Sequence, residues 1–435
     1  MRVLKFLVLL AIFSLPGVAA AEITVQVTRG LGDAQPIAIV PFGFEGQGRP
    51  AVDVAAVVAA DLERSGRFKP FPVSDMLEKP VRAADVKYQN WRVLGVDYVV
   101  VGNIQVQDGG YVIQFQLLDV YRGQQLMGYS VPIRGEYLRR GAHQVADLVY
   151  EELTGVPGAF STRIAFVLAT GKGEDTRYQL VVADADGENQ RTILRSARPL
   201  MSPTWSPDGR RLAYVSFENQ VAEVFVQELA SGQRQKVSSR EGVNGAPSFS
   251  PDGRKLAMTL SSEAGNLDIW VKDLESGELT RVTRHPAIDT EAVWAPDGRT
   301  LFFTSDRGGA PQIYRIDWQA GNDRPERVTF EGNYNARPTL SPDGKLLGVL
   351  HQSNRGFNIG VLDLARRTFN VLTEGRQDES PSFAPNGAMI IYATSEGNRG
   401  VLAATSVDGR VQQRLAVQEG DVREPSWSPA QEAGR

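Results

Sequence analysis

Few residues of this 435-residue chain have types and spacing that could do chemistry. The three histidines, His143, His285 and His351, lie far apart and show no metal-ligand spacing, and there is no cysteine to act as a nucleophile. The chain has neither a G-x-S-x-G nucleophile elbow nor an H-E-x-x-H zinc motif. Each histidine is therefore interpreted as a surface or packing residue, and we predict no catalytic residue, no cofactor and no metal site.

One acidic motif, Asp184-x-Asp186-Gly187, resembles the start of a calcium-binding loop. Such a loop needs a third ligand and a distal glutamate, and both are missing here. The motif also aligns with two small-residue hairpins, at Ser231-Gly232 and Asp408-Gly409. We therefore interpret it as a hairpin turn.

The elements that carry these residues follow from an internal repeat. A proline-based turn recurs at intervals of 43–46 residues, at Ser206-Pro207-Asp208-Gly209, Ser250-Pro251-Asp252-Gly253, Ala295-Pro296-Asp297-Gly298, Ser341-Pro342-Asp343-Gly344, Ala384-Pro385-Asn386-Gly387 and, in short form, Ser428-Pro429. Proline presets φ for a turn, Asp or Asn accepts local backbone bonds, and glycine takes the left-handed position. A β-rich segment follows each complete copy. Four short strands in about 40–45 residues form the unit of a propeller blade.

The two ends of this repeat region complement each other. Residues 164–167 resemble the strand that follows each turn but have no turn before them, whereas residues 425–429 have nothing after them. We predict that 425–429 joins the blade begun at 164. The expected architecture is an all-β six-bladed propeller over 156–435, closed by the C-terminal strand.

Residues 37–155 lack the repeat and predict a small α/β domain. Residues 51–64 show helical spacing and Gly66 suits the end of that helix. Strands are expected at 37–40, 98–101, 111–118 and 126–132, and a second helix over 137–153, which gives the order β-α-β-β-β-α.

The N-terminus has the pattern of a secretory leader. Arg2 and Lys5 precede an apolar run that closes on Ala19-Ala20-Ala21, so we expect a signal peptide over 1–21. No later stretch is apolar enough to span a bilayer. The formal net charge of −4 argues against a nucleic-acid-binding protein, which would carry a basic stripe.

Residues 22–36 form a separate feature between the leader and the first clear strand. Ile23, Val25 and Val27 alternate with polar residues, and a glycine-containing stretch follows. The segment is either a frayed end or edge strand, or a flexible docking peptide that pairs onto a sheet or is released.

Taken together, the whole chain after the leader resembles the TolB family, the periplasmic propellers of the Tol–Pal cell-envelope system. The SPDG turn alone is shared with other propellers, but its combination with this N-terminal domain and a leader is specific. The residues that carry the resemblance include Pro41-Phe42, Leu153-Thr154-Gly155, Leu200-Met201-Ser202-Pro203, Trp205-Ser206-Pro207-Asp208-Gly209, Asn244-Gly245-Ala246-Pro247 and Thr304-Ser305-Asp306.

The resemblance implies a non-enzymatic periplasmic scaffold. It implies binding of the peptidoglycan-associated lipoprotein Pal at the propeller and of TolA through the N-terminal segment, with a role in outer-membrane integrity and constriction at cell division. Bacteriocins are further partners of the family. For this chain we expect a monomer with no nucleic-acid partner and no transmembrane segment after the leader.

Two sets of residues carry these expectations. The segments that lead into the first strand of each blade should surround the channel, opposite the SPDG turns, and supply the Pal-binding face: Leu200, Met201, Val243, Asn244, Gly245, Ala246, Asp289, Thr290, Glu291, Asn335, Arg337, Asp378, Glu379 and Arg423. An alternative is that these residues only shape the start of each strand. The TolA-docking segment comprises Glu22, Ile23, Val25, Val27, Arg29 and Asp33.

Two other functions stay open at this point. A periplasmic lyase or hydrolase would need a buried carboxylate or histidine cluster with perturbed pKa values in the channel. A propeller that binds a small ligand or carbohydrate would need an aromatic-lined channel mouth.

Overall fold

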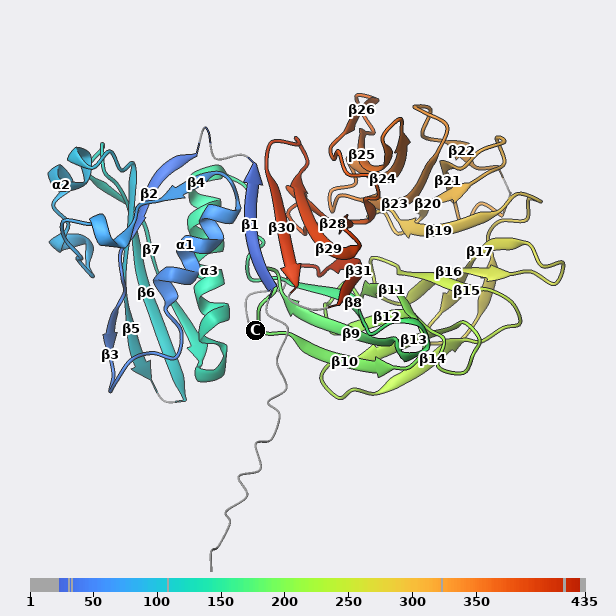
Figure 1. The fold of residues 1–435 in the computed structure, drawn as a ribbon, viewed down its shortest axis with the longest axis horizontal. Helices are drawn as coiled ribbons and strands as arrows, with labels where there is room; N and C mark the ends of the chain where they lie inside the picture. The colour runs from blue at the N-terminus through green and yellow to red at the C-terminus, as the bar shows by residue number, and fades with distance from the viewer. Residues whose placement is uncertain are drawn as a thin grey trace, which may run out of the picture.

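The computed structural model describes residues 23–29, 32, 34–107, 109–321, 324–417 and 420–430. The predicted leader, 1–21, lies outside the described residues. Within the described part of the chain, no helix is long and apolar enough to cross a membrane. An N-terminal α/β domain lies beside a β-propeller (Figure 1).

The N-terminal domain is built on one mixed sheet of order β4-β2-β5-β6-β7, with β3 paired to β5. Its strands are β2 (Gln35–Ile39), β3 (Gly43–Glu45), β4 (Phe68–Pro70), β5 (Tyr98–Gln107), β6 (Gly110–Asp119) and β7 (Gln124–Arg134). Its helices are α1 (Val54–Arg64), α2 (Tyr88–Val93) and α3 (Leu138–Thr154), with the 3-10 turns η1 (Val73–Asp75), η2 (Ala83–Asp85) and η3 (Gly135–Tyr137). The α/β prediction is confirmed, although the short elements β3, β4 and α2 have no clear sequence signal.

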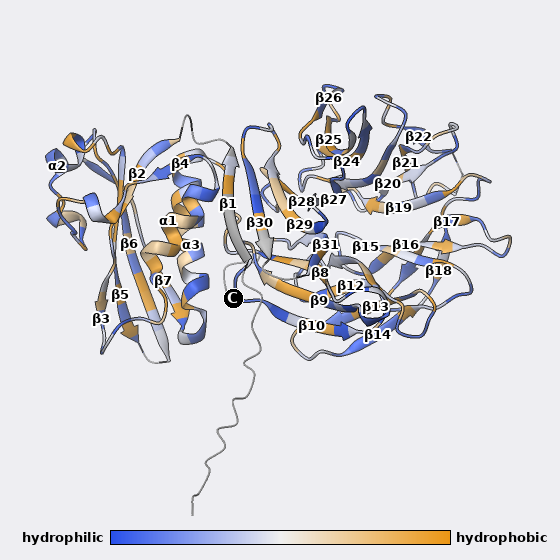
Figure 2. Cartoon of the chain, viewed as in Figure 1, coloured by the Kyte–Doolittle hydropathy of each residue, from blue (hydrophilic) through white to orange (hydrophobic). Residues whose placement is uncertain are grey.

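Both long helices are bounded by residues suited to their ends. The Asp53 carboxylate caps α1 by accepting the N–H of Ala56 at 3.0 Å. Gly66, with φ of +68°, follows the C-cap of α1, as predicted, and Gly155 ends α3 in the same left-handed conformation. The helices α1 and α3, which carry many hydrophobic residues (Figure 2), pack their apolar side chains on one face of the sheet. The other face packs on fully buried Trp91 of α2.

The propeller has six blades, confirming the predicted fold class. From the channel outward, blade 1 consists of β31 (Asp421–Trp427), β8 (Arg163–Thr170), β9 (Arg177–Asp184) and β10 (Arg191–Ser196), with η4 (Gly173–Asp175) between β8 and β9, and blade 2 consists of β11 (Leu200–Trp205), β12 (Arg211–Ser216), β13 (Glu223–Glu228) and β14 (Arg234–Ser238). In the same order, blade 3 consists of β15 (Asn244–Phe249), β16 (Lys255–Ser261), β17 (Leu267–Asp273) and β18 (Leu279–Arg281), and blade 4 consists of β19 (Asp289–Trp294), β20 (Thr300–Ser305), β21 (Gln312–Asp317) and β22 (Glu326–Arg327). Blade 5 consists of β23 (Asn335–Leu340), β24 (Leu346–Ser353), β25 (Gly356–Asp363) and β26 (Thr368–Val371), and blade 6 consists of β27 (Glu379–Phe383), β28 (Met389–Glu396), β29 (Arg399–Ser406) and β30 (Gln412–Val417).

The ring is closed by the chain's own C-terminal strand, as predicted. β31 pairs antiparallel with β8, and Trp427 lies opposite Ile164. The indole N–H of Trp427 also donates to Thr162 Oγ1 at 2.8 Å. Blade 1 therefore combines a strand from the end of the propeller with three from its beginning, so the ring cannot close without the last described residues.

The N-terminal segment adds a fifth strand to blade 6. β1 (Ile23–Arg29) pairs antiparallel with β30, and Val27 lies opposite Gln413 (Figure 1). The expected flexible segment 22–36 is thus corrected over 23–29, where backbone pairing orders the chain as an edge strand. Its expected end also moves, because Gln35 and Pro36 already belong to β2.

Candidate functional site

A cavity of about 170 Å³ lies in the propeller channel and is lined by the innermost strand of every blade. Each of these strands carries a β-bulge, where its register with the next strand shifts. At each bulge one non-glycine residue takes a positive φ of 43–58°, and these residues are Ser202, Ala246, Glu291, Arg337, Ser380 and Glu424. Left-handed non-glycine residues cost roughly 1–3 kcal/mol each and gather at functional sites.

The residue after each bulge is proline in five of the six blades, at Pro203, Pro247, Pro338, Pro381 and Pro425. Proline has no backbone N–H to donate, so it is tolerated in a strand that has a partner strand on one side only. The innermost strands are of this kind because they face the channel. Every innermost strand thus carries the bulge, and in five of the six a proline follows it, at the positions that line the channel.

An ion-pair network crosses the channel between blades. Arg337 in blade 5 lies 3.2 Å from Glu291 in blade 4 (Nε–Oε1) and 3.5 Å from Glu424 in blade 1 (Nη2–Oε1). Glu424 also accepts the backbone N–H of Ser202 in blade 2 at 2.7 Å. Burial opposes the charge of Arg337, but the carboxylates of Glu424, Glu291 and Glu379 outweigh it and raise its pKa. The channel is therefore a charge-paired, structured site.

The predicted Pal-binding residues divide into two groups. Nine are exposed or half-buried around the channel mouth, namely Met201, Val243, Gly245, Ala246, Thr290, Glu291, Arg337, Glu379 and Arg423. The other five are no more than 3 % exposed, namely Leu200, Asn244, Asp289, Asn335 and Asp378. We correct the latter to interior residues, whose side chains have no surface to offer a partner.

Four of these buried residues anchor the segments that lead into the innermost strands. Asn244 Oδ1 accepts from Ser238 Oγ at 2.5 Å and from the N–H of Arg240 at 3.0 Å. Asp289 binds Arg307 at 2.8 Å, and Asp378 accepts from Thr394 Oγ1 at 2.5 Å. Asn335 in turn contacts Nδ1 of His351 at 2.9 Å. For these four residues the alternative interpretation from the sequence holds: their hydrogen bonds and ion pairs shape the start of the innermost strands.

Apolar side chains stand exposed around the same mouth. Met201 is 38 % and Val243 42 % exposed, as expected for predicted contacts. Sequence reasoning missed Val221, Ile288 and Phe330, which lie in loops at this end of blades 2, 4 and 5 and are 49–66 % exposed. The sequence did not set them apart, because each of these loops holds other apolar residues, such as Phe217, Ala287 and Tyr334. Exposed apolar side chains interspersed with polar groups are a common composition of protein-binding surfaces. We call Met201, Val221, Val243, Ile288 and Phe330 the apolar rim.

The N-terminal domain packs at the opposite end of the propeller. Asn386, in the proline turn of blade 6, donates to the carbonyl of Pro157 at 2.9 Å. Arg64 of α1 donates to the carbonyl of Ala185, in the β9–β10 hairpin of blade 1, at 3.3 Å. Because this turn and this hairpin are at the far end of the propeller from the strand-leading segments, the described residues of the N-terminal domain leave the channel mouth uncovered.

The predicted TolA-docking residues fall on or beside β1. Glu22 and Asp33 lie outside the described residues, and for Ile23, Val25 and Arg29 only the backbone is described. Val27 is half-buried against blade 6, and Thr28 Oγ1 donates to the carbonyl of Gln412 at 3.2 Å. As the fifth strand, β1 pairs through its backbone with β30 at the sheet edge.

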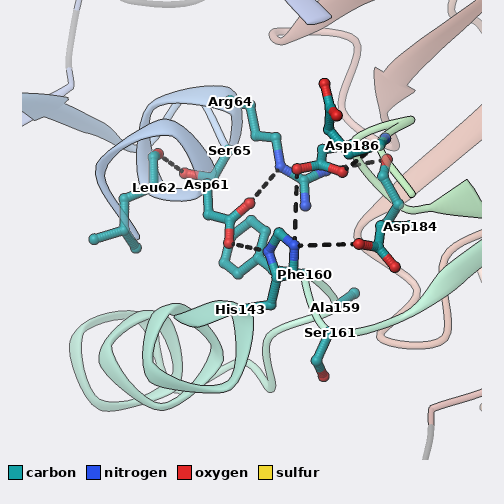
Figure 3. A network of polar contacts seen from close by, with 12 residues as sticks. Asp61, Leu62, Arg64, Ser65, His143, Ala159, Phe160, Ser161, Asp184 and Asp186 are labelled. Carbon is teal, nitrogen blue, oxygen red and sulfur yellow. Dashed lines mark hydrogen bonds and ion pairs between the residues drawn. The ribbon is translucent and has the colours of Figure 1, made fainter. Parts of the chain in front are cut away.

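The histidines and the Asp184 motif have structural surroundings that the sequence did not show. Asp184–Gly187 is a hairpin turn, as predicted, with the N–H of Gly187 bonded to the Asp184 carbonyl at 2.8 Å. Yet its two carboxylates face His143, which is 1 % exposed at the domain interface (Figure 3). Asp61, His143 and Asp186 lie close enough to hold an ion. However, Arg64 and Arg139 already bind these carboxylates, which fits an ion-pair cluster.

The fold and the open mouth define a class of protein, a six-bladed β-propeller with an α/β domain at the far end. The model of the TolB amino-terminal domain matches residues 23–126, and that of the TolB β-propeller domain matches 150–431. The chain is 49 % identical to the Tol–Pal system protein TolB of Xanthomonas oryzae pv. oryzae and of Xanthomonas campestris pv. campestris, over 98 % of each chain.

Among solved structures, TolB from Acinetobacter baumannii is similar with a TM-score of 0.87 and 41 % identity, covering 94 % of this chain and 100 % of that one. The chain belongs to the TolB family of Tol–Pal system proteins. The family resemblance inferred from the sequence is confirmed.

Proposed function

We propose that this protein is a non-enzymatic periplasmic scaffold that binds the lipoprotein Pal on the channel-mouth end of its propeller. The observation that carries the proposal is the apolar rim around an uncovered, charge-paired mouth. Protein interfaces are enriched in aromatic side chains, methionine and arginine, and they combine apolar with polar contact groups. The rim and the channel network supply these two parts.

The second part of the proposal assigns β1 to TolA. β1 is an edge strand, and an edge strand can pair with another sheet through its backbone groups. The same strand can therefore lie on β30 or on a partner. In this scheme the protein links Pal at one end to TolA near the other, in support of outer-membrane integrity and constriction at division, and bacteriocins compete for these surfaces.

A direct test compares Pal binding by three forms of the full chain after the leader, using calorimetry. A Met201→Glu, Val243→Glu double variant places two charges on the apolar rim and should weaken binding at least tenfold, because charges would be desolvated at the contact. The matched control is Val93→Glu, which changes an apolar residue that is 78 % exposed on α2. Equal affinity of all three forms would overturn the assignment of this face.

A further inference from the structure

A buried cluster of charged side chains joins the two domains. α1 contributes Asp61 and Arg64, α3 contributes His143, and the β9–β10 hairpin of blade 1 contributes Asp184 and Asp186 (Figure 3). Arg139 of α3 completes the cluster. Asp61 and His143 are each 1 % exposed. The cluster therefore places a buried histidine from one domain directly against partly buried carboxylates of the other.

One ring nitrogen of His143 is fixed by its own domain. Nδ1 lies 2.6 Å from Oδ2 of Asp61, and Oδ1 of Asp61 accepts from Arg64 Nε at 3.0 Å. An ionised carboxylate can only accept hydrogen bonds, so Nδ1 carries a hydrogen and donates it. This bond orients the imidazole and leaves Nε2 pointing toward the propeller.

The other nitrogen, Nε2, meets the propeller. It lies 3.8 Å from Oδ2 of Asp184 and 3.7 Å from Oδ2 of Asp186, and it is buried without a hydrogen-bond partner among the described residues. A neutral imidazole would direct a lone pair at these oxygens and repel them. A protonated imidazolium would direct an N–H at them and attract both. Whether His143 attracts or repels the carboxylates of the propeller therefore depends on one proton.

The charges around His143 favour the protonated form of its imidazole. Three carboxylates, Asp61, Asp184 and Asp186, face two guanidinium groups, so the cluster has one negative charge in excess when His143 is neutral. A proton on His143 balances it. Further out, Asp147 on α3 and Glu188 in the hairpin are acidic, whereas Arg140 on α3 and Arg163 in β8, which acts on Asp184, are basic, so these outer groups leave the balance unchanged. A divalent ion would compete with Arg139, which already binds Asp186 and lies 3.7 Å from Asp184.

We propose that His143 is a proton-dependent latch, which holds the N-terminal domain on blade 1 while its imidazole is protonated and weakens that contact when the proton leaves. The latch also connects to β1. Arg64, which shares Asp61 with His143, accepts a hydrogen bond at its backbone carbonyl from the side chain of Gln413 in β30. Gln413 is the residue opposite Val27 of β1. A looser interface between the domains would therefore also weaken the position of β30 against which β1 pairs.

The direction of the pH effect follows from the same contacts. Burial opposes the charge on His143, but the carboxylate of Asp61, through charge and hydrogen bond, and that of Asp186 outweigh it and raise the pKa of His143 above its usual 6.5. A group with a raised folded-state pKa stabilises the fold fully below its unfolded pKa. That contribution is lost as the pH rises through the folded-state value, so the latch should weaken on the alkaline side of pH 6.5.

The test is an NMR titration of the histidine rings in the full chain after the leader, where only three histidines give signals. His143 is identified by the loss of its signal in His143→Gln or, if that variant does not fold, by elimination with His285→Gln and His351→Gln. We expect the His143 ring to titrate above 6.5, and Asp186→Asn to lower its pKa. A ring that titrates at or below 6.5 overturns the latch, as does a ring signal that changes when EDTA removes a metal ion.

Amide exchange supplies the conformational half of the test. As the pH rises through the pKa of His143, the amide-exchange rate, corrected for its intrinsic pH dependence, should increase at least threefold in the 184–187 hairpin and in β1. In His143→Gln it should be high at every pH, whereas the control His285→Gln, half-buried in a loop of the propeller, should behave as the wild type. Unchanged exchange at both segments across the titration contradicts the latch.

Discussion

Arg337 of blade 5 and Glu424 of blade 1 meet in the propeller channel, with Nη2 of the guanidinium 3.5 Å from Oε1 of the carboxylate. The two residues occupy equivalent positions in their blades, each with a positive φ at the bulge of an innermost strand. Residues that are 87 positions apart in the sequence are thus brought together by the ring. The pair ties the last strand of the chain to blade 5 across the channel, independently of the backbone ladder.

Replacing Arg337 by alanine should therefore destabilise the propeller. The substitution leaves Glu291 and Glu424 without their shared cation in a half-buried site, which costs about 1–3 kcal/mol of unfolding free energy. Denaturant unfolding measures the change. Arg315→Ala is the control, because Arg315 pairs with Glu326 on the exposed outer strands and should cost less than about 0.5 kcal/mol. Equal losses for both variants would contradict a special role of the channel network.

Truncation after Gly420 should open the ring. It removes β31, the innermost strand of blade 1, and with it the ladder to β8 and the contacts of Trp427 with Thr162 and Ser382. The freed edge of β8 would be long and apolar, so the shortened chain should lose cooperative unfolding and aggregate. Thermal scanning with light scattering checks this, and a truncated chain that unfolds at the wild-type temperature would refute the role of closure.

Much of this architecture could be predicted because local rules repeat. Each proline turn sets its own geometry, as in blade 3, where Ser250, Asp252 and Gly253 form the expected bonds and positive φ. The ring closure was predictable because Trp427 and Ile164 each completed a pattern that the other end lacked. Short strands such as β3 and β4 were missed because three residues carry no periodicity and depend on a neighbouring strand for their conformation.

Asp147 should make stability fall as the pH rises in the acidic range. Its carboxylate accepts the N–H of Phe160 at 2.6 Å and of Ser161 at 3.1 Å, which ties α3 to the chain entering the propeller. Burial raises its pKa to about 6, only partly offset by these bonds. Its contribution is therefore fully present below its unfolded pKa of 3.8 and lost by about pH 6.

The measurement is the unfolding free energy of the wild type minus that of Asp147→Asn, followed from pH 4 to pH 7. This difference should fall by about 2–3 kcal/mol over the window, because a shift of one pKa unit corresponds to about 1.4 kcal/mol. A difference that is flat, or that rises with pH, would show that the Asp147 carboxyl is not protonated in the folded state at mildly acidic pH.

Deleting residues 22–33 should remove TolA binding and expose one sheet edge, with little effect on the rest of the propeller. β1 is the outermost strand of blade 6, so its loss leaves the four-stranded blade intact. Amide exchange should rise in β30 and stay unchanged in β16 and β24 of other blades. TolA binding that persists in the deletion variant would rule out the segment as the docking site.

The candidate site was only partly predictable. Sequence spacing placed the strand-leading segments at one end of the propeller, but it could not tell that Asn244 and Asp289 turn inward to anchor loops while Val243 and Ile288, each one residue before them, turn outward. That alternation depends on the strand register, which is set by the neighbouring strand. The His143 cluster was invisible for a similar reason, since Asp61, His143 and Asp186 come from three separate elements.

The most direct test of the central claim is amide-exchange mapping of the protein with and without saturating Pal. The account predicts protection in the segments 199–202, 242–246, 287–291 and 329–337, which surround the channel mouth and carry most of the apolar rim, with the proline turns at the other end unchanged. Protection of those turns or of the N-terminal domain, with none at the mouth, would contradict it.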